Sequence, residues 1–158
     1  MWHLPLFKWF DQTWIGSTIR ASTYAFPVIE CIHLIGMVLL IGAIVVIDMR
    51  LLGLGMRRQP VARVAAALAP VSLTGLITML VTGSLLFLSE ALKCYGNEGF
   101  HYKMYFLFPG IVVYFTIHRW ITKREDSKIG PIWGKVVGLL SMALWFGVAL
   151  GGRAIGFV

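Results

Sequence analysis

The stretch from Tyr24 to Asp48, YAFPVIECIHLIGMVLLIGAIVVID, decides the fold because it is long and apolar enough to cross a membrane. A helix rises ~1.5 Å per residue and a hydrocarbon core is ~30 Å thick, so a helix of this length spans it. Glu30 and His33 lie inside the stretch, three residues apart and therefore on one helix face. Because ionisable groups are costly in lipid, that face should turn toward protein, water or a cofactor.

Composition points to the same environment. The chain has 158 residues, of which 58% are hydrophobic and 13% charged, and its mean hydropathy is +0.81. A soluble domain of this length could not bury such a share of apolar surface. We therefore expect an all-α integral membrane protein. The net charge of +7 comes from basic residues placed between apolar stretches. That placement is typical of membrane topology, so we expect no nucleic-acid binding.

The hydropathy pattern predicts one membrane domain over residues 1–158, an antiparallel bundle of four transmembrane helices. The predicted spans are residues 24–48, 66–89, 100–121 and 132–152. Residues 1–22 are rich in Trp and Phe and predict an amphipathic helix in the membrane interface, roughly from Leu6 to Arg20. Pro109 should kink the third span or loosen a hydrogen bond there.

Glycines four residues apart near the fourth span predict close helix packing, either inside the bundle or in a homo-oligomer. The pairs are Gly134 with Gly138, Gly147 with Gly151, and Gly152 with Gly156.

The distribution of basic residues predicts the topology. The first and third loops hold four and five Lys or Arg, whereas the N-terminal segment, the second loop and the C-terminal end hold two, two and one. Because cytoplasmic loops carry the excess of basic residues, loops one and three should be cytoplasmic. The prediction is a multi-pass protein of the bacterial inner membrane with both termini on the periplasmic side.

Polar residues from the predicted helices should meet in the outer half of the bundle. His33 lies roughly 13 Å below the outer surface, at ~1.5 Å per residue. Lys103 and Arg153 lie near the outer ends of the third and fourth helices, and Glu30 is one turn shallower than His33. This set suits a b-type haem, with His33 as axial ligand to the iron and Glu30 as its polar support. Lys103 and Arg153 would hold the propionates, and Gly110 would leave room for the ring.

A second haem ligand is harder to assign. His118 lies ~25 Å deep by the same rise, ~12 Å below His33, so it is the less favoured metal ligand. Met79 or Met37, a water or an open position would then face His33. A quinone or a lipid remains an alternative occupant. Without any cofactor, Glu30, His33 and Lys103 would form a structural or proton-handling cluster.

Several motifs resemble a family of small bacterial inner-membrane proteins of unknown function. They are Glu30-x-x-His33-x-x-Gly36, Asp48-x-Arg50-Leu51-Leu52-Gly53-Leu54, Thr82-Gly83-x-x-x-x-Phe87, Asn97-x-x-Phe100-x-x-Lys103 and Gly152-Arg153-x-Ile155-x-Phe157. The resemblance covers nearly the whole chain from about Trp14 and implies no activity. More distantly, the first-helix His and third-helix Lys resemble those of haem-containing membrane protoporphyrinogen oxidases, and the bundle is similar to copper-resistance-type proteins and b-type cytochromes. These likenesses favour a haem.

Three functions therefore stay open at this point. The first is a redox-linked protein with one haem b, or a related cofactor, that transfers electrons to a membrane or periplasmic redox partner. The second is a non-enzymatic membrane subunit whose glycine-rich faces dock a partner. The third is a small ion, proton or metal conduit. Whether the chain is an enzyme, and whether Cys31 and Cys94 have a role, is left open by the residues.

Overall fold

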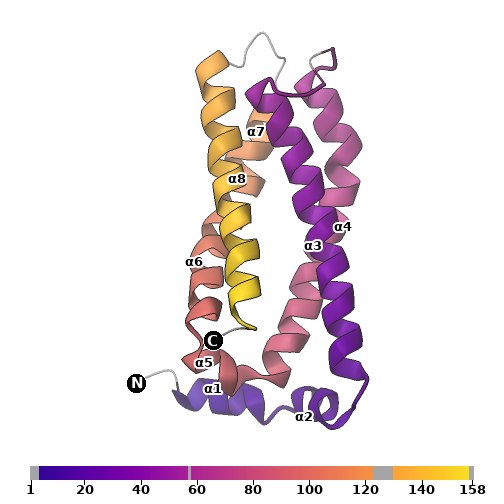
Figure 1. The fold of residues 1–158 in the computed structure, drawn as a ribbon, viewed down its shortest axis with the longest axis vertical. Coiled ribbons are helices and arrows are strands. Elements are labelled where there is room, and N and C mark those ends of the chain that lie inside the picture. The colour runs from indigo at the N-terminus through magenta and orange to yellow at the C-terminus, as the bar shows by residue number, and fades with distance from the viewer. Residues whose placement is uncertain (1–3, 57, 123–129, 157–158) are drawn as a thin grey trace.

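The computed structural model describes residues 4–56, 58–122 and 130–156, and the regular elements in that part are all helices. Long rods run side by side along the molecule, and two short helices lie across one end (Figure 1). The elements are α1 Leu4–Asp11, α2 Trp14–Ala21, α3 Ala25–Leu52, α4 Val61–Ser89, α5 Ala91–Gly96, α6 Glu98–Val113, the π-helical η1 Tyr114–His118, α7 Arg119–Thr122 and α8 Pro131–Ala154.

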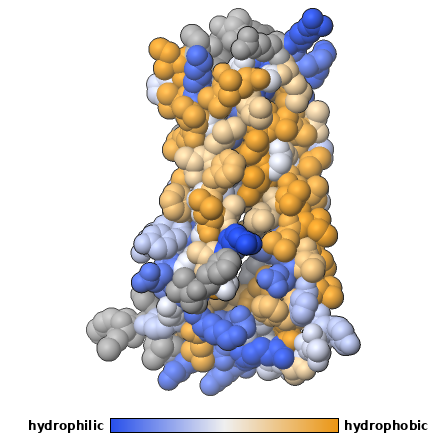
Figure 2. Space-filling view, in the orientation of Figure 1, coloured by the Kyte–Doolittle hydropathy of each residue, from blue (hydrophilic) through white to orange (hydrophobic). Residues whose placement is uncertain are grey.

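Three of the described helices are long and apolar enough to cross a membrane: Ala25–Leu52, Val61–Ser89 and Ile132–Ala154. On the face drawn in Figure 2, apolar side chains cover most of the surface, and hydrophilic ones gather toward the lower end. Large apolar side chains such as Val38, Val81 and Leu150 are exposed along these helices, as expected of surfaces that face lipid. The prediction of an all-α, multi-pass membrane protein is confirmed for these three spans.

The prediction of a fourth such span at 100–121 is wrong as made, because no single long α-helix covers those residues. The 16-residue α6 ends at Val113, the π-helical η1 follows, and α7 holds only four residues. Pro109 was the expected point of irregularity, yet α6 continues through it. The change of helix type begins at Tyr114, where a π-turn widens the rod without breaking its course. The path from α6 to α7 still runs the length of the bundle, antiparallel to α8 (Figure 1).

Helix boundaries also differ from the predicted ones. The first long helix continues beyond Asp48 to Leu52, where Gly53 ends it in the left-handed conformation at φ 76°. Such a conformation carries no Cβ penalty in glycine, which is why glycine commonly follows a helix. The next helix begins directly after Pro60, well before residue 66. Both helices therefore extend beyond the predicted spans at the end that carries the basic first loop.

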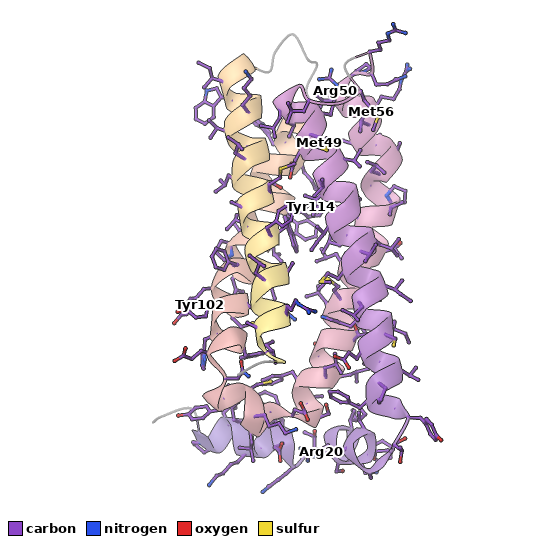
Figure 3. All side chains as sticks on the ribbon, viewed as in Figure 1. Arg20, Met49, Arg50, Met56, Tyr102 and Tyr114 are labelled. Atoms are coloured by element: carbon purple, nitrogen blue, oxygen red, sulfur yellow. The ribbon has the colours of Figure 1, made fainter. Side chains whose placement is uncertain are left out.

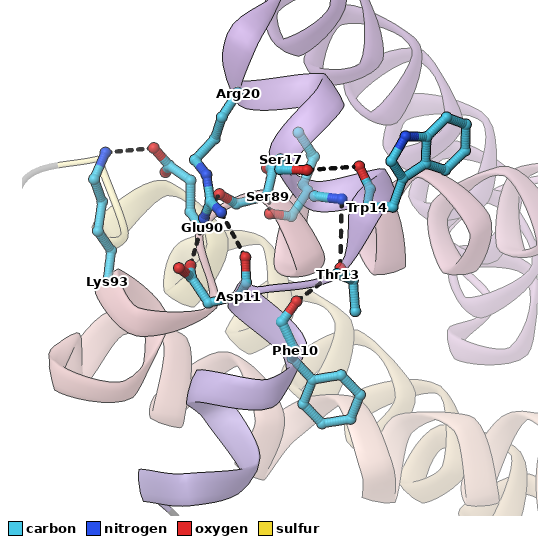
Figure 4. Close-up of polar contacts among 11 residues, drawn as sticks. Phe10, Asp11, Thr13, Trp14, Ser17, Arg20, Ser89, Glu90 and Lys93 are labelled. Carbon is cyan, nitrogen blue, oxygen red and sulfur yellow. Dashed lines mark hydrogen bonds and ion pairs between the residues drawn. The ribbon is translucent and has the colours of Figure 1, made fainter.

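The predicted interfacial helix from Leu6 to Arg20 is two helices. Thr13 caps α2 by accepting a hydrogen bond from the Gly16 amide at 3.4 Å, and its own hydroxyl donates to the Phe10 carbonyl at 2.7 Å. This local bonding ends α1 and starts α2 in a new direction. Arg20 then binds the Asp11 carboxylate and donates to the Ser89 carbonyl at 2.8 Å (Figure 4). The N-terminal segment is thus fixed to the end of α4.

The long helices form two closely packed pairs. In the first pair, a Cβ on Gly75 of α4 would lie 2.8 Å from the Gly36 carbonyl oxygen of α3. In the second, Gly147 and Gly151 of α8 lie against Phe106 and Lys103 of α6. The glycines therefore support packing inside the bundle, whereas a homo-oligomer contact stays a prediction.

A buried core joins the two pairs around mid-height. Leu40 and Met79 come from the first pair, Trp145 and Val148 come from α8, and Tyr114 comes from η1. Tyr114 lies inside the bundle, between the two pairs (Figure 3). The backbones of the two pairs come close mainly between α3 and α8. Between α4 and α6 the contact is made by side chains, such as the stacked rings of Phe87 and Phe100, whose centroids lie 5.5 Å apart.

Candidate functional site

Three helices each contribute one polar side chain to a cluster in the half of the bundle that adjoins α1 and α2. His33 of α3 is buried, with 9% of its surface exposed. Its Nδ1 lies 2.8 Å from the Thr82 hydroxyl of α4, and its Nε2 lies 3.5 Å from the Lys103 ammonium of α6. The predicted meeting of His33 and Lys103 is therefore what the structure shows.

Thr82 decides which ring nitrogen of His33 carries the proton. The Thr82 hydroxyl donates its only hydrogen to the Thr78 carbonyl one turn earlier on α4. Its oxygen can then only accept from His33, so Nδ1 must be the donor. In the neutral imidazole this leaves the lone pair on Nε2, which faces Lys103.

The close contact between α3 and α4 holds the His33 imidazole in place. A Cβ on Gly83 would lie 3.1 Å from Cε1 of His33, so the ring rests against the bare backbone at that position. One turn deeper, a Cβ on Gly36 would meet the Thr78 methyl at 2.9 Å. The spacing His33-x-x-Gly36 on one helix and Thr82-Gly83 on the other therefore belongs to a single helix contact.

A second helix contact positions Lys103. A Cβ on Gly151 of α8 would lie 2.8 Å from the Lys103 amide nitrogen, so the two backbones nearly touch. Asn97 caps α6 by accepting from the Phe100 amide at 3.1 Å, and its side-chain amide donates to the Ile155 carbonyl at 3.1 Å. The residues of Asn97-x-x-Phe100-x-x-Lys103 thus begin α6 and fix it to the end of α8.

The other predicted site residues do not all join this cluster. Glu30 is exposed and makes no hydrogen bond or ion pair within the described residues, so Thr82 supplies the polar support expected from Glu30. Gly110 lies against Trp145 and Leu144 of α8, which occupy the space expected to be open for a ring. Met79 is buried in the apolar core, three residues before Thr82.

The two remaining predicted residues lie at the ends of their helices. Arg153 is exposed near the end of α8. His118 ends η1, and its side chain falls outside the described part of the molecule.

Sequence reasoning missed two features. Thr82 was recognised as part of the motif Thr82-Gly83-x-x-x-x-Phe87 but was not connected to His33. The second is a buried hydroxyl pair deeper in the bundle, where Ser72 and Tyr114 lie 2.7 Å apart. Its only sequence signal was the helical spacing of Ser72, Gly75, Met79 and Thr82, which is typical of a helix contact in lipid.

The chemistry available at the cluster is limited and specific. His33 offers a lone pair on Nε2 and Lys103 offers ammonium hydrogens beside it. Within the described residues, no group of three or more His, Cys, Asp or Glu could hold a metal ion. The cluster can therefore ligate one metal position from one side, accept a proton, or bind an anionic group.

Comparison with known proteins identifies a family for the chain but no activity. A family of unknown function (DUF6644) matches residues 6–158. No curated protein matches the chain, and no solved structure does.

Proposed function

The chain belongs to DUF6644, a family with no assigned activity, and we propose from its site that it is a redox-linked membrane protein holding one b-type haem through Nε2 of His33. The observation that carries this proposal is the pair of hydrogen bonds at the Thr82 hydroxyl, from which the tautomer of His33 follows. Metal-bound histidines donate their other ring N–H to a polar acceptor, which orients the ring and raises its basicity. Thr82 takes that role for Nδ1, and so leaves Nε2 ready to bind iron.

The position of Lys103 is compatible with this proposal on one condition. Its ammonium now lies 3.5 Å from Nε2, so it must leave that nitrogen when a metal binds. A long flexible side chain near the end of a helix can make that movement and then pair with an acidic group of the cofactor. A bound haem would supply one-electron transfer, while His33, Thr82 and Lys103 would bind and orient it.

The residues expected to frame the ring give less support. Trp145 lies against Gly110, Glu30 is exposed, and the thioether of Met79 belongs to the apolar core. We therefore propose a haem with one protein ligand, held between the helix pair that carries His33 and Thr82 and the helix that carries Lys103. Quinone stays an alternative cofactor for the same lone pair and ammonium.

The test is a reduced-minus-oxidised visible spectrum of detergent-purified protein from cells well supplied with haem. A Soret band with reducible α and β bands is expected, and His33→Ala should remove it. His101→Ala is the matched control, because His101 is exposed and bonds only the Asn97 carbonyl among the described residues. A spectrum that survives His33→Ala, or a colourless wild-type protein, would remove the haem proposal.

The distance between Lys103 and His33 favours a second candidate, a proton-handling site. Nζ and Nε2 are close enough to pass a proton with a small movement of the lysine. Proton uptake into liposomes, followed by an enclosed pH dye, would test this in the same preparation. Loss of uptake in both Lys103→Met and His33→Phe, with no visible chromophore in the wild type, would select this function over haem binding.

The topology forms part of the proposal. We propose that α6, η1 and α7 together make a fourth crossing, since their path matches the length of the bundle (Figure 1). Basic residues gather at the end holding the loops after α3 and before α8; those described are Arg50, Arg58, Arg63, Arg119 and Lys135. By the positive-inside rule this end is cytoplasmic, and the His33 cluster then lies in the periplasmic half of an inner membrane. A redox partner would approach from that side.

A further inference from the structure

A cavity of about 360 Å³ lies at the other end of the bundle from His33. It is bounded by α4 on one side and by η1 and α7 on the other. We propose that this cavity binds one acyl chain of an anionic phospholipid, whose head group pairs with Arg119 at the rim. The proposal is independent of the cofactor proposed at His33.

The wall formed by α4 is made of methyl groups. Ala62, Ala65, Ala66 and Ala69 line the cavity at the spacing of one helix face. Leucine side chains at these positions would fill the space between α4 and η1. The alanines leave an apolar trough, and its opposite wall includes Phe115.

The floor of the cavity selects the kind of group that enters. Ser72, with 1% of its surface exposed, donates its hydroxyl hydrogen to the Ala69 carbonyl at 3.1 Å. The Ser72 and Tyr114 hydroxyls lie 2.7 Å apart, and either can donate to the other. Both hydroxyls therefore have a hydrogen-bond partner inside the protein. A hydrocarbon end can reach the floor without leaving either hydroxyl without a partner.

The cavity runs along α4 from the loop end toward the middle of the bundle. Ser72, at its floor, lies 11 residues after Val61, the first residue of α4. At ~1.5 Å per residue this is roughly 16 Å of helix, part of which lies in the interface because α4 is longer than a ~30 Å hydrocarbon core requires. A chain that enters from the loop end therefore runs along the helix into the nearer leaflet, as a phospholipid acyl chain does.

The charge at the rim selects the head group. Arg119 lines the cavity at the basic end of the molecule, beyond the aromatic residues Tyr114 and Phe115. A basic rim above an apolar trough favours an anionic lipid over a zwitterionic one.

The experiment uses full-length protein in liposomes that contain a phosphatidylglycerol with a photoactivatable diazirine on one acyl chain. After illumination, mass spectrometry maps the adducts. The expected adducts lie on the peptides of α4, η1 and α7 that line the cavity. A phosphatidylcholine probe with the same chain should give a yield lower by about five-fold, the worth of one basic contact at an anionic surface.

Two matched pairs of variants separate the cavity from the general lipid surface. Ala65→Leu fills the cavity and should reduce the adducts several-fold, whereas Ala67→Leu, at an exposed position off the cavity, should not. Arg119→Gln should reduce phosphatidylglycerol labelling to the phosphatidylcholine level, and Arg63→Gln should not. Equal labelling by the two probes, or wild-type adducts mapping away from the cavity, would overturn the proposal. If a variant fails to fold, the positions of the adducts on the wild-type protein still test the proposal.

Discussion

The Thr82 hydroxyl is the group on which the orientation of His33 depends. Thr82→Val keeps the shape of the side chain but removes the oxygen that accepts from Nδ1, at 2.8 Å. A buried donor left without a partner costs ~1–3 kcal/mol, and loss of such a support weakens metal binding ~10–100-fold. We expect Thr82→Val to lower thermal stability in detergent and, with the proposed haem bound, to release it on dilution.

The matched variant is Thr82→Ser, which retains the oxygen. It should keep both stability and cofactor. If Thr82→Val and Thr82→Ser behave alike in thermal unfolding and haem retention, the methyl group rather than the hydrogen bond supports the site.

Cys94, in the short α5 outside the long apolar helices, is a residue whose protonation the fold controls. Burial, followed by the nearby Glu90 carboxylate, raises the pKa of its thiol from 9.0 to about 11. Because the folded state favours the neutral thiol, the stabilising contribution is complete below pH 9 and is lost as pH rises toward 11. In a Cys31→Ser background, thiolate formation followed by ultraviolet absorbance should reach its midpoint near pH 11 when folded.

The same protein unfolded in denaturant provides the reference for Cys94. Its midpoint should fall to about 9, where the folded protein forms roughly 50-fold less thiolate. Glu90→Gln should lower the folded midpoint, since it removes one of the charges that oppose ionisation. Coincident folded and unfolded midpoints would show that Cys94 is open to solvent.

At the level of elements, Asn97 has two separable roles. Its side-chain oxygen caps α6, and its amide hydrogen binds the Ile155 carbonyl beyond α8. Asn97→Ala removes both interactions and should cost about 1–2 kcal/mol from the cap alone. Asn97→Asp keeps the cap but loses the donor, so it should fall between wild type and Asn97→Ala in thermal unfolding. An Asn97→Asp protein as unstable as Asn97→Ala would assign the whole effect to the Ile155 contact.

The sequence predicts the positions of the long helices better than it predicts how each helix is rotated about its own axis. Length and hydropathy identify the three long spans, and a constant rise per residue puts His33 and Lys103 in the same half of the bundle, where their side chains lie 3.5 Å apart. Glu30 shows the limit. Residues three apart differ by roughly 60° around a helix, because each residue turns about 100°. That difference leaves Glu30 exposed while His33 is buried, and only the packing against α4 decides it.

The π-turn and the partner of His33 lie beyond sequence reasoning for a similar reason. The change from α-helical to π-helical hydrogen bonding at Tyr114 is not accompanied by any residue type that a hydropathy pattern would detect. Thr82 and His33 are 49 residues apart in sequence, and their hydrogen bond depends on the close approach that Gly36 and Gly75 permit. Contacts across two helices follow from their relative rotation and separation, which composition does not encode.

At the scale of the whole molecule, the number of crossings fixes the side on which each site faces. The rod α6–η1–α7 runs beside α8, which it contacts closely through Gly147 and Gly151. If it crosses the membrane, residue 130 lies on the same side as Gln59, opposite Lys93. If it does not, residue 130 lies on the side of Lys93. The position before α8 is therefore decisive.

Gly130→Cys in a Cys31→Ser, Cys94→Ala background measures this directly. Gly130 is exposed, and a Cβ there would lie 3.7 Å from the nearest Trp133 ring carbon, an ordinary contact. With four crossings and a cytoplasmic basic end, a membrane-impermeant maleimide should label Gly130→Cys and Gln59→Cys only in inside-out vesicles. Lys93→Cys should be labelled in intact spheroplasts. Labelling of Gly130→Cys together with Lys93→Cys would leave three crossings, and the cavity beside Arg119 would then need a different route to the bilayer.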